Sequence, residues 1–380
     1  MIYLDNAATS FIKPEGVVKA VCETTYKNSA NAGRGGYSAA IKSSEILYET
    51  REKLARVFGI NNPERIVFCK NTTEALNFGI KGVMHKGGHI ITTSMEHNSV
   101  IRPIKALEQN GVFCFVLQGD KDGNIDVEKL EKMIKPQTKM IIMTHSSNVC
   151  GNIYNIEKAA EIAHKHRVLF MVDAAQSAGS IPVFAKNIDL LAFPGHKGLL
   201  GPMGTGGLYV REGVNIKPLT EGGTGSLSES LLQPDFFPDM LESGTQNVPA
   251  IAGLGAACDF LLKNGIQNIH NYEKELRERF EEKVLNMENI KVYGGNHKTA
   301  ITAMNIKGAD CIEVAQRLAD DYGICVRSGL HCAILAHKTL GIQNTGCVRF
   351  SFGYFNTPKE IDAAADAVYK ISKDLQKCQN

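Results

Sequence analysis

Short runs of β-branched and aromatic residues alternate with longer stretches of helical periodicity between residue 64 and about residue 210. Buried parallel strands form nearly continuous apolar runs, and the helices between them serve as crossovers. The pattern therefore predicts an α/β fold with a mainly parallel sheet that is covered on both faces. Seven strands are expected, at residues 65–69, 89–94, 112–117, 139–145, 168–172, 190–193 and 206–210.

The helices of this region are expected at residues 73–81, 99–109, 127–134 and 156–166. Residues 213–249 are rich in Gly, Pro and Ser, which predicts an irregular segment long enough to have a function. The remaining chain predicts helices at 250–263 and 272–285, strands at 291–293, 300–306, 324–327 and 348–352, and a helix from Pro358. We therefore expect a large α/β domain at residues 16–249, and a smaller α+β domain made of residues 1–15 with 250–380.

The charge balance argues against a nucleic-acid partner. The chain has 380 residues, with 42 basic and 40 acidic side chains and a net charge of +2, which is too close to neutral for a polyanion-binding protein. Its first residues have no basic flank and include an acid at position 5, so no secretory signal is expected. No segment offers the roughly 18 apolar residues that cross a membrane. These features predict a soluble, cytoplasmic protein with a small-molecule substrate.

Ten cysteines are scattered along the chain without a C-x-x-C pair. This spacing predicts neither a disulfide scaffold nor a zinc knuckle, and no metal site is expected. Most free cysteines are buried apolar side chains. Only a cysteine in a polar loop marked by glycine is therefore a candidate for chemistry.

Polar clusters follow the predicted strands at the point where each strand ends. Ligands of parallel sheets bind at the carboxyl ends of the strands, so these clusters are candidates for a common site. The clusters are residues 71–73, 96–98, 145–148, 173–176 and 195–197.

Two of these clusters contain a carboxylate and an amine that suit pyridoxal-phosphate (PLP) chemistry. Asp173 follows a buried strand, and Lys197 follows the next strand and a Pro-Gly-His turn. In PLP enzymes a lysine forms a Schiff base with the cofactor, and a carboxylate pairs with the protonated pyridine nitrogen. A helix-capping aspartate and a surface lysine are the alternatives for either residue alone.

The other clusters contain residues that could bind the rest of such a cofactor. Asn71 and Glu74 could form a variant capping box, and the helix turn that begins with Thr72 and Thr73 could bind a phosphate. Capping alone would explain this pattern about as well. His97 could lie on a cofactor ring or act as an acid and base, although a histidine seen alone is more often a satisfied core residue.

Asn148 and Gln176 end two further strands and could donate hydrogen bonds to a phenolic oxygen of the ring. Arg349 lies in an otherwise apolar strand, where an unpaired guanidinium would be costly. A substrate carboxylate fits its two-pronged geometry, and an internal Asp or Glu partner is the structural alternative.

The loop Arg327-Ser-Gly-Leu-His331-Cys332-Ala is the most informative stretch of the chain. It follows a strand, includes a glycine, and places Cys332 beside His331 and near Arg327, both of which could favour a thiolate. A nucleophilic cysteine needs such a setting. A buried inert thiol is the alternative, and it fits so polar a loop poorly.

Taken together, the chain resembles the class V aminotransferases, which are fold type I PLP-dependent enzymes. Within them it resembles the branch of cysteine desulfurases and selenocysteine lyases, in particular the SufS-like subgroup. The similar motifs are residues 3–9, 31–37, 72–74, 96–97, the Asp-x-x-Gln at 173–176, the Gly-His-Lys at 195–197, residues 244–245 and the Arg-x-Gly-x-His-Cys loop at 327–332.

The resemblance implies a role for each matching residue. Lys197 would be the Schiff-base lysine, and Cys332 would attack the substrate sulfur. Asn148, Arg327 and Arg349 would bind the substrate, with Arg349 on its carboxylate. The residues implied for cofactor binding are Thr72, Thr73, His97, Asn148, Asp173, Gln176, His196, Lys197 and Thr245.

Thr245 would reach the phosphate of a neighbouring subunit, which implies a homodimer. Two positions depart from the family pattern: Pro194 stands where many relatives have a phosphate-binding serine, and Leu330 where the subgroup often has a histidine. Residues 221–226 match no known role.

The predicted function is removal of sulfur from L-cysteine, which would give alanine and a persulfide on Cys332 that a sulfur-acceptor protein could receive. One alternative is a selenocysteine lyase, in which selenium could leave L-selenocysteine with less need for Cys332. Another is a transaminase or lyase that acts on a different small amino acid. A non-catalytic sulfur-relay subunit is a further alternative, against which Lys197 and Asp173 argue.

Overall fold

The computed structural model describes residues 1–33 and 35–379. Residue 34, which belongs to the 31–37 motif, lies outside the described residues. None of the helices in the described chain is long and apolar enough to cross a bilayer.

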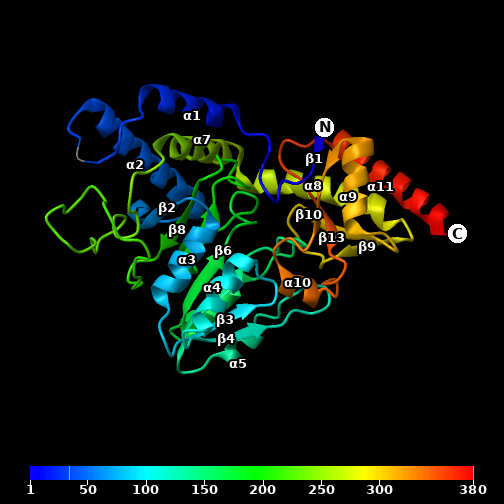
Figure 1. Cartoon of the computed structure of the whole chain (residues 1–380), viewed down its shortest axis with the longest axis horizontal. Coiled ribbons are helices and arrows are strands. Elements are labelled where there is room, and N and C mark those ends of the chain that lie inside the picture. Colours follow the sequence, from blue (N-terminus) through cyan, green and yellow to red (C-terminus); the bar gives the residue numbers. More distant parts are fainter. Residues whose placement is uncertain (34, 380) are drawn as a thin grey trace.

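A seven-stranded sheet forms the centre of the larger part of the molecule (Figure 1). Its strand order is β2-β8-β7-β6-β5-β3-β4, and every neighbouring pair is parallel except those of β8, which is antiparallel to β2 and β7. The predicted mainly parallel sheet is confirmed. The strands are β2 (Ile66–Cys69), β3 (His89–Thr93), β4 (Phe113–Leu117), β5 (Thr138–Thr144), β6 (Leu169–Asp173), β7 (Leu190–Pro194) and β8 (Gly206–Val210).

Three of the four crossover helices, α3, α4 and α6, begin at a residue whose side chain caps the helix. The side chain of Asn155, for example, accepts a hydrogen bond from Lys158 N at 3.0 Å at the start of α6, which then buries Ile156 and Ala159. Three helices match their predicted ranges closely, whereas α5 has five residues instead of the expected 127–134. The crossover helices are α3 (Thr72–Val83), α4 (Asn98–Glu108), α5 (Lys129–Met133) and α6 (Ile156–Lys165).

Three further helices pack together beside this sheet: α1 (Glu15–Lys27), α2 (Ser38–Phe58) and α7 (Val248–Asn264) (Figure 1). The sequence prediction named no helix before residue 73, so α1 and α2 were missed. Between β8 and α7 the chain forms neither helix nor strand, in agreement with the irregular segment expected at 213–249.

A second, four-stranded antiparallel sheet of order β12-β13-β10-β9 forms the smaller part of the molecule. β1 (Ile2–Tyr3) pairs with β11 (Ile324–Cys325), so the N-terminus lies here too. The predicted strand at 324–327 is in fact two strands, and α8 begins at Ile266 rather than at 272. The remaining elements are α8 (Ile266–Leu285), β9 (Ile290–Tyr293), β10 (Ile301–Ile306), α9 (Cys311–Tyr322), β12 (Arg327–Gly329), α10 (Ile334–Thr339), β13 (Cys347–Ser351) and α11 (Pro358–Gln379).

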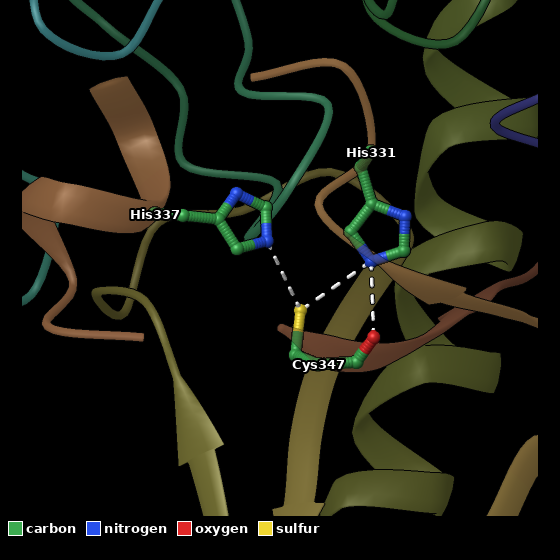
Figure 2. A group of neighbouring side chains, drawn as sticks. All are labelled: His331, His337 and Cys347. Atoms are coloured by element: carbon green, nitrogen blue, oxygen red, sulfur yellow. Dashed lines mark hydrogen bonds between the residues drawn. The ribbon is translucent and has the colours of Figure 1, made fainter. Parts of the chain in front are cut away.

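β13 also borders the segment that carries the candidate nucleophile. Cys347 is the first residue of β13, and its Sγ lies near Nε2 of His331 and of His337 (Figure 2). The domain boundary predicted at residues 249 and 250 stays a prediction.

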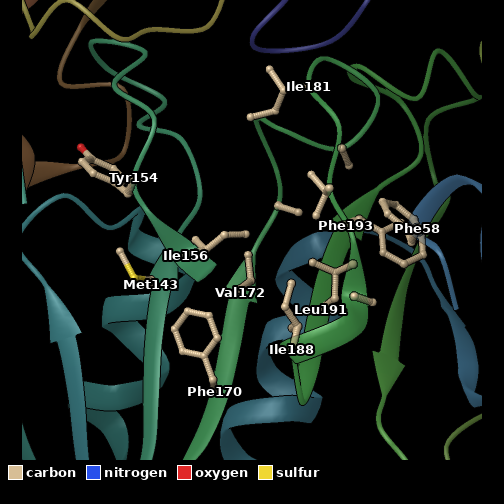
Figure 3. Packing of buried hydrophobic residues seen from close by; sticks show 14 of the residues in the cluster. Phe58, Met143, Tyr154, Ile156, Phe170, Val172, Ile181, Ile188, Leu191 and Phe193 are labelled. Atoms are coloured by element: carbon tan, nitrogen blue, oxygen red, sulfur yellow. The ribbon is translucent and has the colours of Figure 1, made fainter. Parts of the chain in front are cut away.

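The large sheet is held by apolar side chains that alternate along its central strands (Figure 3). Phe170 and Val172 of β6 pack in one cluster with Leu191 and Phe193 of β7. The ring of Phe193 lies 4.8 Å from that of Phe58 in α2, measured between centroids, which attaches this helix to the sheet. This close-packed core holds the strands rigidly, and with them the polar residues at their carboxyl ends.

Candidate active site

Five strands bring polar side chains to one edge of the large sheet. β3, β5, β6 and β7 are parallel, and β2 runs in the same direction because β8 is antiparallel to both β2 and β7. Their carboxyl ends therefore meet at one edge, where ligands of such sheets bind. A pocket at this edge is lined by eight of the nine residues predicted to bind the cofactor: Thr72, Thr73, His97, Asn148, Asp173, Gln176, His196 and Lys197.

Asp173 and Lys197 lie in this pocket with shifted proton affinities. Burial raises the pKa of the Asp173 carboxyl to about 6, against a hydrogen bond from Ala175 N at 2.9 Å and the attraction of Lys197. Burial and the positive charge of Arg349 lower the pKa of the Lys197 amine to about 8. A cationic group on a ligand would therefore stabilise the ionised Asp173 carboxylate. Lys197 can act as a nucleophile or base near neutral pH.

The shifted amine predicts a pH dependence for the reaction of Lys197 with an aldehyde. The amine reacts only when neutral, so the rate at which PLP adds to the ligand-free protein should rise with pH and reach half of its maximum near pH 8. Stopped-flow absorbance measures this rate. A midpoint near 10.5, the ordinary value for lysine, would contradict the described environment.

The first turn of α3 and its cap line the pocket through Asn71, Thr72 and Thr73. The Asn71 side chain accepts a hydrogen bond from Glu74 N at 2.9 Å and so caps the helix. The Glu74 carboxylate reaches Lys70 N at 2.6 Å, which is the variant capping box expected from the sequence, shifted by one residue. Thr72 and Thr73 follow the cap, and the turn that they begin has the donors and the dipole that bind a phosphate.

His97 is held as a neutral ring beside this turn. Ser99 N donates to His97 Nδ1 at 3.0 Å, so the ring carries its proton on Nε2. Burial and Lys197 lower the pKa of His97 to about 4. A ring with this pKa is a weak base near neutral pH, which favours contact with a cofactor over proton transfer.

His196 links Lys197 to the N-terminal segment. Its Nδ1 lies 3.1 Å from Thr9 Oγ1, and its carbonyl oxygen accepts hydrogen bonds from Ser10 N and Lys13 Nζ at 3.1 and 3.0 Å. These contacts fix the backbone next to the reactive amine. Burial lowers the pKa of His196 to about 4, so this ring is also neutral.

The Cys332 loop lies over the same region. The exposed Cys332 lines a second pocket, which shares Thr73, His97 and Ser99 with the first. Asn98 N donates to Cys332 O at 2.7 Å, which anchors the loop beside the pocket.

Two amides of the pocket hold neighbouring segments. Asn148 Nδ2 donates to His331 O at 2.8 Å, and Gln176 Nε2 donates to Ala7 O at 2.9 Å. Both amides therefore position the loops around the pocket, whatever they bind besides.

His331 does not act on Cys332 as expected. Its Nε2 lies 3.2 Å from the carbonyl oxygen of Cys347, and burial lowers its pKa to about 2. The ring is therefore neutral and directed at Cys347, so it contributes no positive charge that would stabilise a Cys332 thiolate. The local reason is the backbone: His331 and Cys332 both have a positive φ, of 47° and 54°, which turns the two side chains differently from an extended chain.

Arg349 has the internal carboxylate partner that was the alternative to a substrate. Its Nη2 lies 3.0 Å from Asp5 Oδ1, and its Nη1 donates to Asn148 O at 2.8 Å. Arg327 Nη2 contacts Asp5 Oδ2 at 2.9 Å, so one carboxylate holds both arginines. The Nε of Arg349 is buried without an acceptor among the described residues.

Replacing Asp5 with asparagine should lower the free energy of unfolding by about 3 kcal/mol, because it leaves the buried Arg349 without its counter-charge. Urea unfolding measures the change. Asp126→Asn is the matched control, since Asp126 contacts Lys129 at 3.4 Å on the surface and its loss should cost less than about 1 kcal/mol. Equal losses of unfolding free energy in the two variants would show that the buried Asp5–Arg349 pair stabilises the fold no more than a surface pair does.

Thr245 lies apart from the cofactor residues within one chain. It lines a separate pocket with Lys70, Glu74 and Asn247. Gly244 N donates to Gly223 O at 2.8 Å, so residues 221–226, which had no predicted role, pack beside Thr245. A contact of Thr245 with the phosphate of another subunit stays a prediction.

Ser99 and Asp5 also belong to the site, although the sequence pattern did not predict them. Ser99 Oγ lies 2.8 Å from Thr73 Oγ1 and 2.9 Å from His97 Nδ1, so it joins two elements of the pocket. Its signal was its place directly after the 96–98 cluster. Asp5 could have been found in the 3–9 motif, of which it is the only charged residue.

The chain is similar to proteins of known family along nearly its whole length. The family model described as aminotransferase class V matches residues 2–364. A probable cysteine desulfurase of Methanothermobacter thermautotrophicus is 37% identical over 98% of this chain and 94% of its own length. The cysteine desulfurase of Cronobacter sakazakii is 31% identical over 99% of this chain and 94% of its own.

Two solved structures have the same fold. The apo cysteine desulfurase of Thermococcus onnurineus NA1 superposes with a TM-score of 0.93 at 35% identity, and covers 98% of this chain and 95% of its own. The cysteine desulfurase CsdA of Escherichia coli gives a TM-score of 0.89 at 28% identity, and covers 98% and 94%.

Proposed function

The chain belongs to the class V aminotransferase family, and on this premise we propose that it is a PLP-dependent cysteine desulfurase acting on L-cysteine. One observation carries the proposal: the exposed Cys332 opens into a pocket that shares three side chains with the pocket of Lys197 and Asp173. A transaminase needs the amine and the carboxylate but has no use for a thiol at this place. The Cys332 thiol at this place could accept the sulfur of the substrate.

The residues of the pocket fit PLP. The first turn of α3, with Thr72 and Thr73, offers donors for the phosphate, and the buried Asp173 suits a protonated ring nitrogen. The Lys197 amine lies in the same pocket, where an aldehyde carbon could reach it. When bound, PLP supplies that aldehyde and a ring that withdraws electrons from the α-carbon of an amino acid.

Lys197 is the residue best suited to move the α-proton of the substrate. Its pKa of about 8 lets Nζ accept a proton near neutral pH and return it later. The neutral His97 is less suited, because its pKa of about 4 makes it a poor base.

Cys332 takes the sulfur. Its thiolate attacks the substrate sulfur, so that a sulfur–sulfur bond forms and the carbon–sulfur bond breaks. The electron pair of the broken bond stays on the substrate carbon, which then takes up a proton to give alanine. The sulfur remains on Cys332 as a persulfide, from which a sulfur-acceptor protein could receive it.

Arg349 is proposed to bind the substrate carboxylate. Two of its nitrogens are occupied by Asp5 and Asn148, but the buried Nε–H has no acceptor among the described residues. A buried donor without an acceptor costs about 1–3 kcal/mol, and a carboxylate oxygen would recover this. The side chain of Arg327, about half exposed beside Asp5, could approach the same group.

Incubation of the purified protein with L-cysteine tests the proposal. We expect equal amounts of alanine and sulfide in the presence of a reductant, which releases the persulfide sulfur. An α-keto acid with pyridoxamine phosphate would instead indicate a transaminase. A colourless protein that makes no alanine after addition of PLP would indicate a subunit without catalysis.

We also infer a homodimer. Thr245 lines a pocket that contains none of Thr72, Thr73, His196 and Lys197 of its own chain, and we propose that it contacts the phosphate of a second copy. Leu231 and Leu232, which belong to the same irregular segment, are fully or largely exposed and would be covered by such a partner. Analytical ultracentrifugation of the PLP-loaded protein measures the oligomeric state.

A further inference from the structure

Two imidazoles and a thiol, those of His331, His337 and Cys347, form a cluster at the Cys332 loop, to which His331 belongs (Figure 2). His331 comes from the loop, His337 from α10 and Cys347 from the start of β13. We propose that this cluster is a binding site for a zinc-like cation, held by Nε2 of both histidines and Sγ of the cysteine. The site is separate from the PLP pocket and uses none of its lining residues.

The spacing of the three ligand atoms is close to that of a metal site. The thiol Sγ lies 3.4 Å from His331 Nε2 and 3.9 Å from His337 Nε2, and all three atoms lie within 4.8 Å of one another. In a tetrahedral zinc site a sulfur and a nitrogen ligand are about 3.5 Å apart. The two imidazole nitrogens of such a site would be about 3.3 Å apart, so the rings must close by up to about 1.5 Å to complete the geometry.

The surroundings of His337 also favour a cation. Its Nδ1 lies 3.0 Å from Ala333 O and its Nε2 lies 3.2 Å from Gly329 O, so each ring nitrogen faces a carbonyl oxygen. In its neutral form the ring has only one N–H, so one nitrogen lone pair faces an oxygen at close range. A metal ion on Nε2 would remove this conflict, and Nδ1–H would still donate to Ala333 O as metal-bound histidines do.

The ligand set selects the kind of ion. Two imidazoles and one thiolate suit zinc and other borderline or soft cations, and they do not suit calcium or magnesium. The carbonyl oxygens of Gly329 and Cys347 lie 3.2 Å from the two ring nitrogens and could supply a further ligand. Binding must release the proton of the buried Cys347 thiol to solvent, because only the thiolate is a good ligand.

A bound ion would join three elements that surround the reactive thiol. His331 precedes Cys332 directly, and β13 carries Arg349 two residues after Cys347. The ion would therefore tie the loop of the nucleophile to the strand of the proposed carboxylate ligand. The sequence could not predict this site, because the two histidines and the cysteine lack the spacing of a zinc motif and meet only in the fold.

Equilibrium dialysis of the PLP-loaded protein against zinc, buffered by a chelator, tests the site. We expect one zinc per chain in the wild type, and an affinity lower by about 100-fold or more in Cys347→Ser and in His337→Gln, since each removes one ligand. Circular dichroism checks that both variants are folded. Zinc binding is measured without turnover, so the result does not depend on the desulfurase reaction.

Two control variants make the result specific. Cys258→Ser removes an equally buried thiol in α7 and should keep full affinity. Cys332→Ala should also keep it, because Cys332 is not a ligand. The proposal is overturned if the wild type binds no stoichiometric zinc, if Cys347→Ser binds as tightly as the wild type, or if Cys332→Ala abolishes binding.

Discussion

Alanine formation from L-cysteine will fall by a factor of about 10³ or more when Cys332 is replaced by alanine. The substrate sulfur then has no thiolate to attack it, and the carbon–sulfur bond stays intact. Cys332 is exposed and contacts the rest of the site through its backbone, because its carbonyl accepts the hydrogen bond from Asn98 N. The variant should therefore keep its fold, its PLP and its affinity for the substrate. Steady-state assays of alanine measure the loss.

Cys22→Ala is the matched control, because Cys22 is also exposed but lies on α1, away from both pockets. It should turn over cysteine at the wild-type rate. L-Selenocysteine separates the two closest functions. If Cys332→Ala releases selenide at nearly the wild-type rate but no sulfide, selenium leaves without the thiol and a lyase becomes the better description. Unchanged alanine formation from cysteine in Cys332→Ala would contradict the proposed role of this residue.

Replacing Lys197 with alanine should reduce alanine formation by a factor of about 10²–10⁴, the usual range for loss of a general base. The variant should also lose covalent PLP, which borohydride reduction and peptide mass spectrometry detect. Lys197→Arg should behave in the same way, since a guanidinium keeps the charge but stays protonated. A loss limited to Lys197→Ala would indicate that only the charge matters.

The exposed Lys186 provides the control for this residue. Lys186→Ala should keep both the activity and the labelled peptide at 197. If borohydride attached PLP to another lysine in the wild type, the assignment of Lys197 would be wrong.

The central sheet could be predicted because its strands are buried on both faces, so each strand appears as a short apolar run. α2 could not, because its buried face includes Ser43, Thr50 and Arg51, which blur the helical periodicity. The buried Arg51 is paired with Glu242, far along the chain, and also donates to Ile66 O at 3.1 Å. Such a pairing is a property of the fold and leaves no local pattern.

The polar clusters of the site could be predicted for a similar local reason: each directly follows a strand. Pairs of residues that lie far apart in the sequence could not be predicted in this way. Asp5 reaches Arg349 over 344 positions, because β1 pairs with β11 and Asp5 itself pairs with Ser351 at the end of β13. The error at His331 has the same origin, because its ring turns towards Cys347 and that direction depends on the left-handed backbone of the loop.

The two departures from the family pattern have clear places in the structure. Pro194 is the last residue of β7 and is buried, and it does not line the pocket of Lys197. A phosphate would therefore depend on the turn at Thr72 and Thr73 and on His196. Leu330 is about 40% exposed next to His331, so it lies at the surface of the loop.

The proposed function requires that an amine, a carboxylate and a thiol act on one substrate. Peptide mass spectrometry after a single turnover with L-cysteine, without reductant, tests it most directly. We expect the peptide carrying Cys332 to gain the mass of one sulfur atom in step with alanine release. Alanine release with the added sulfur on another cysteine, or on none, would contradict it.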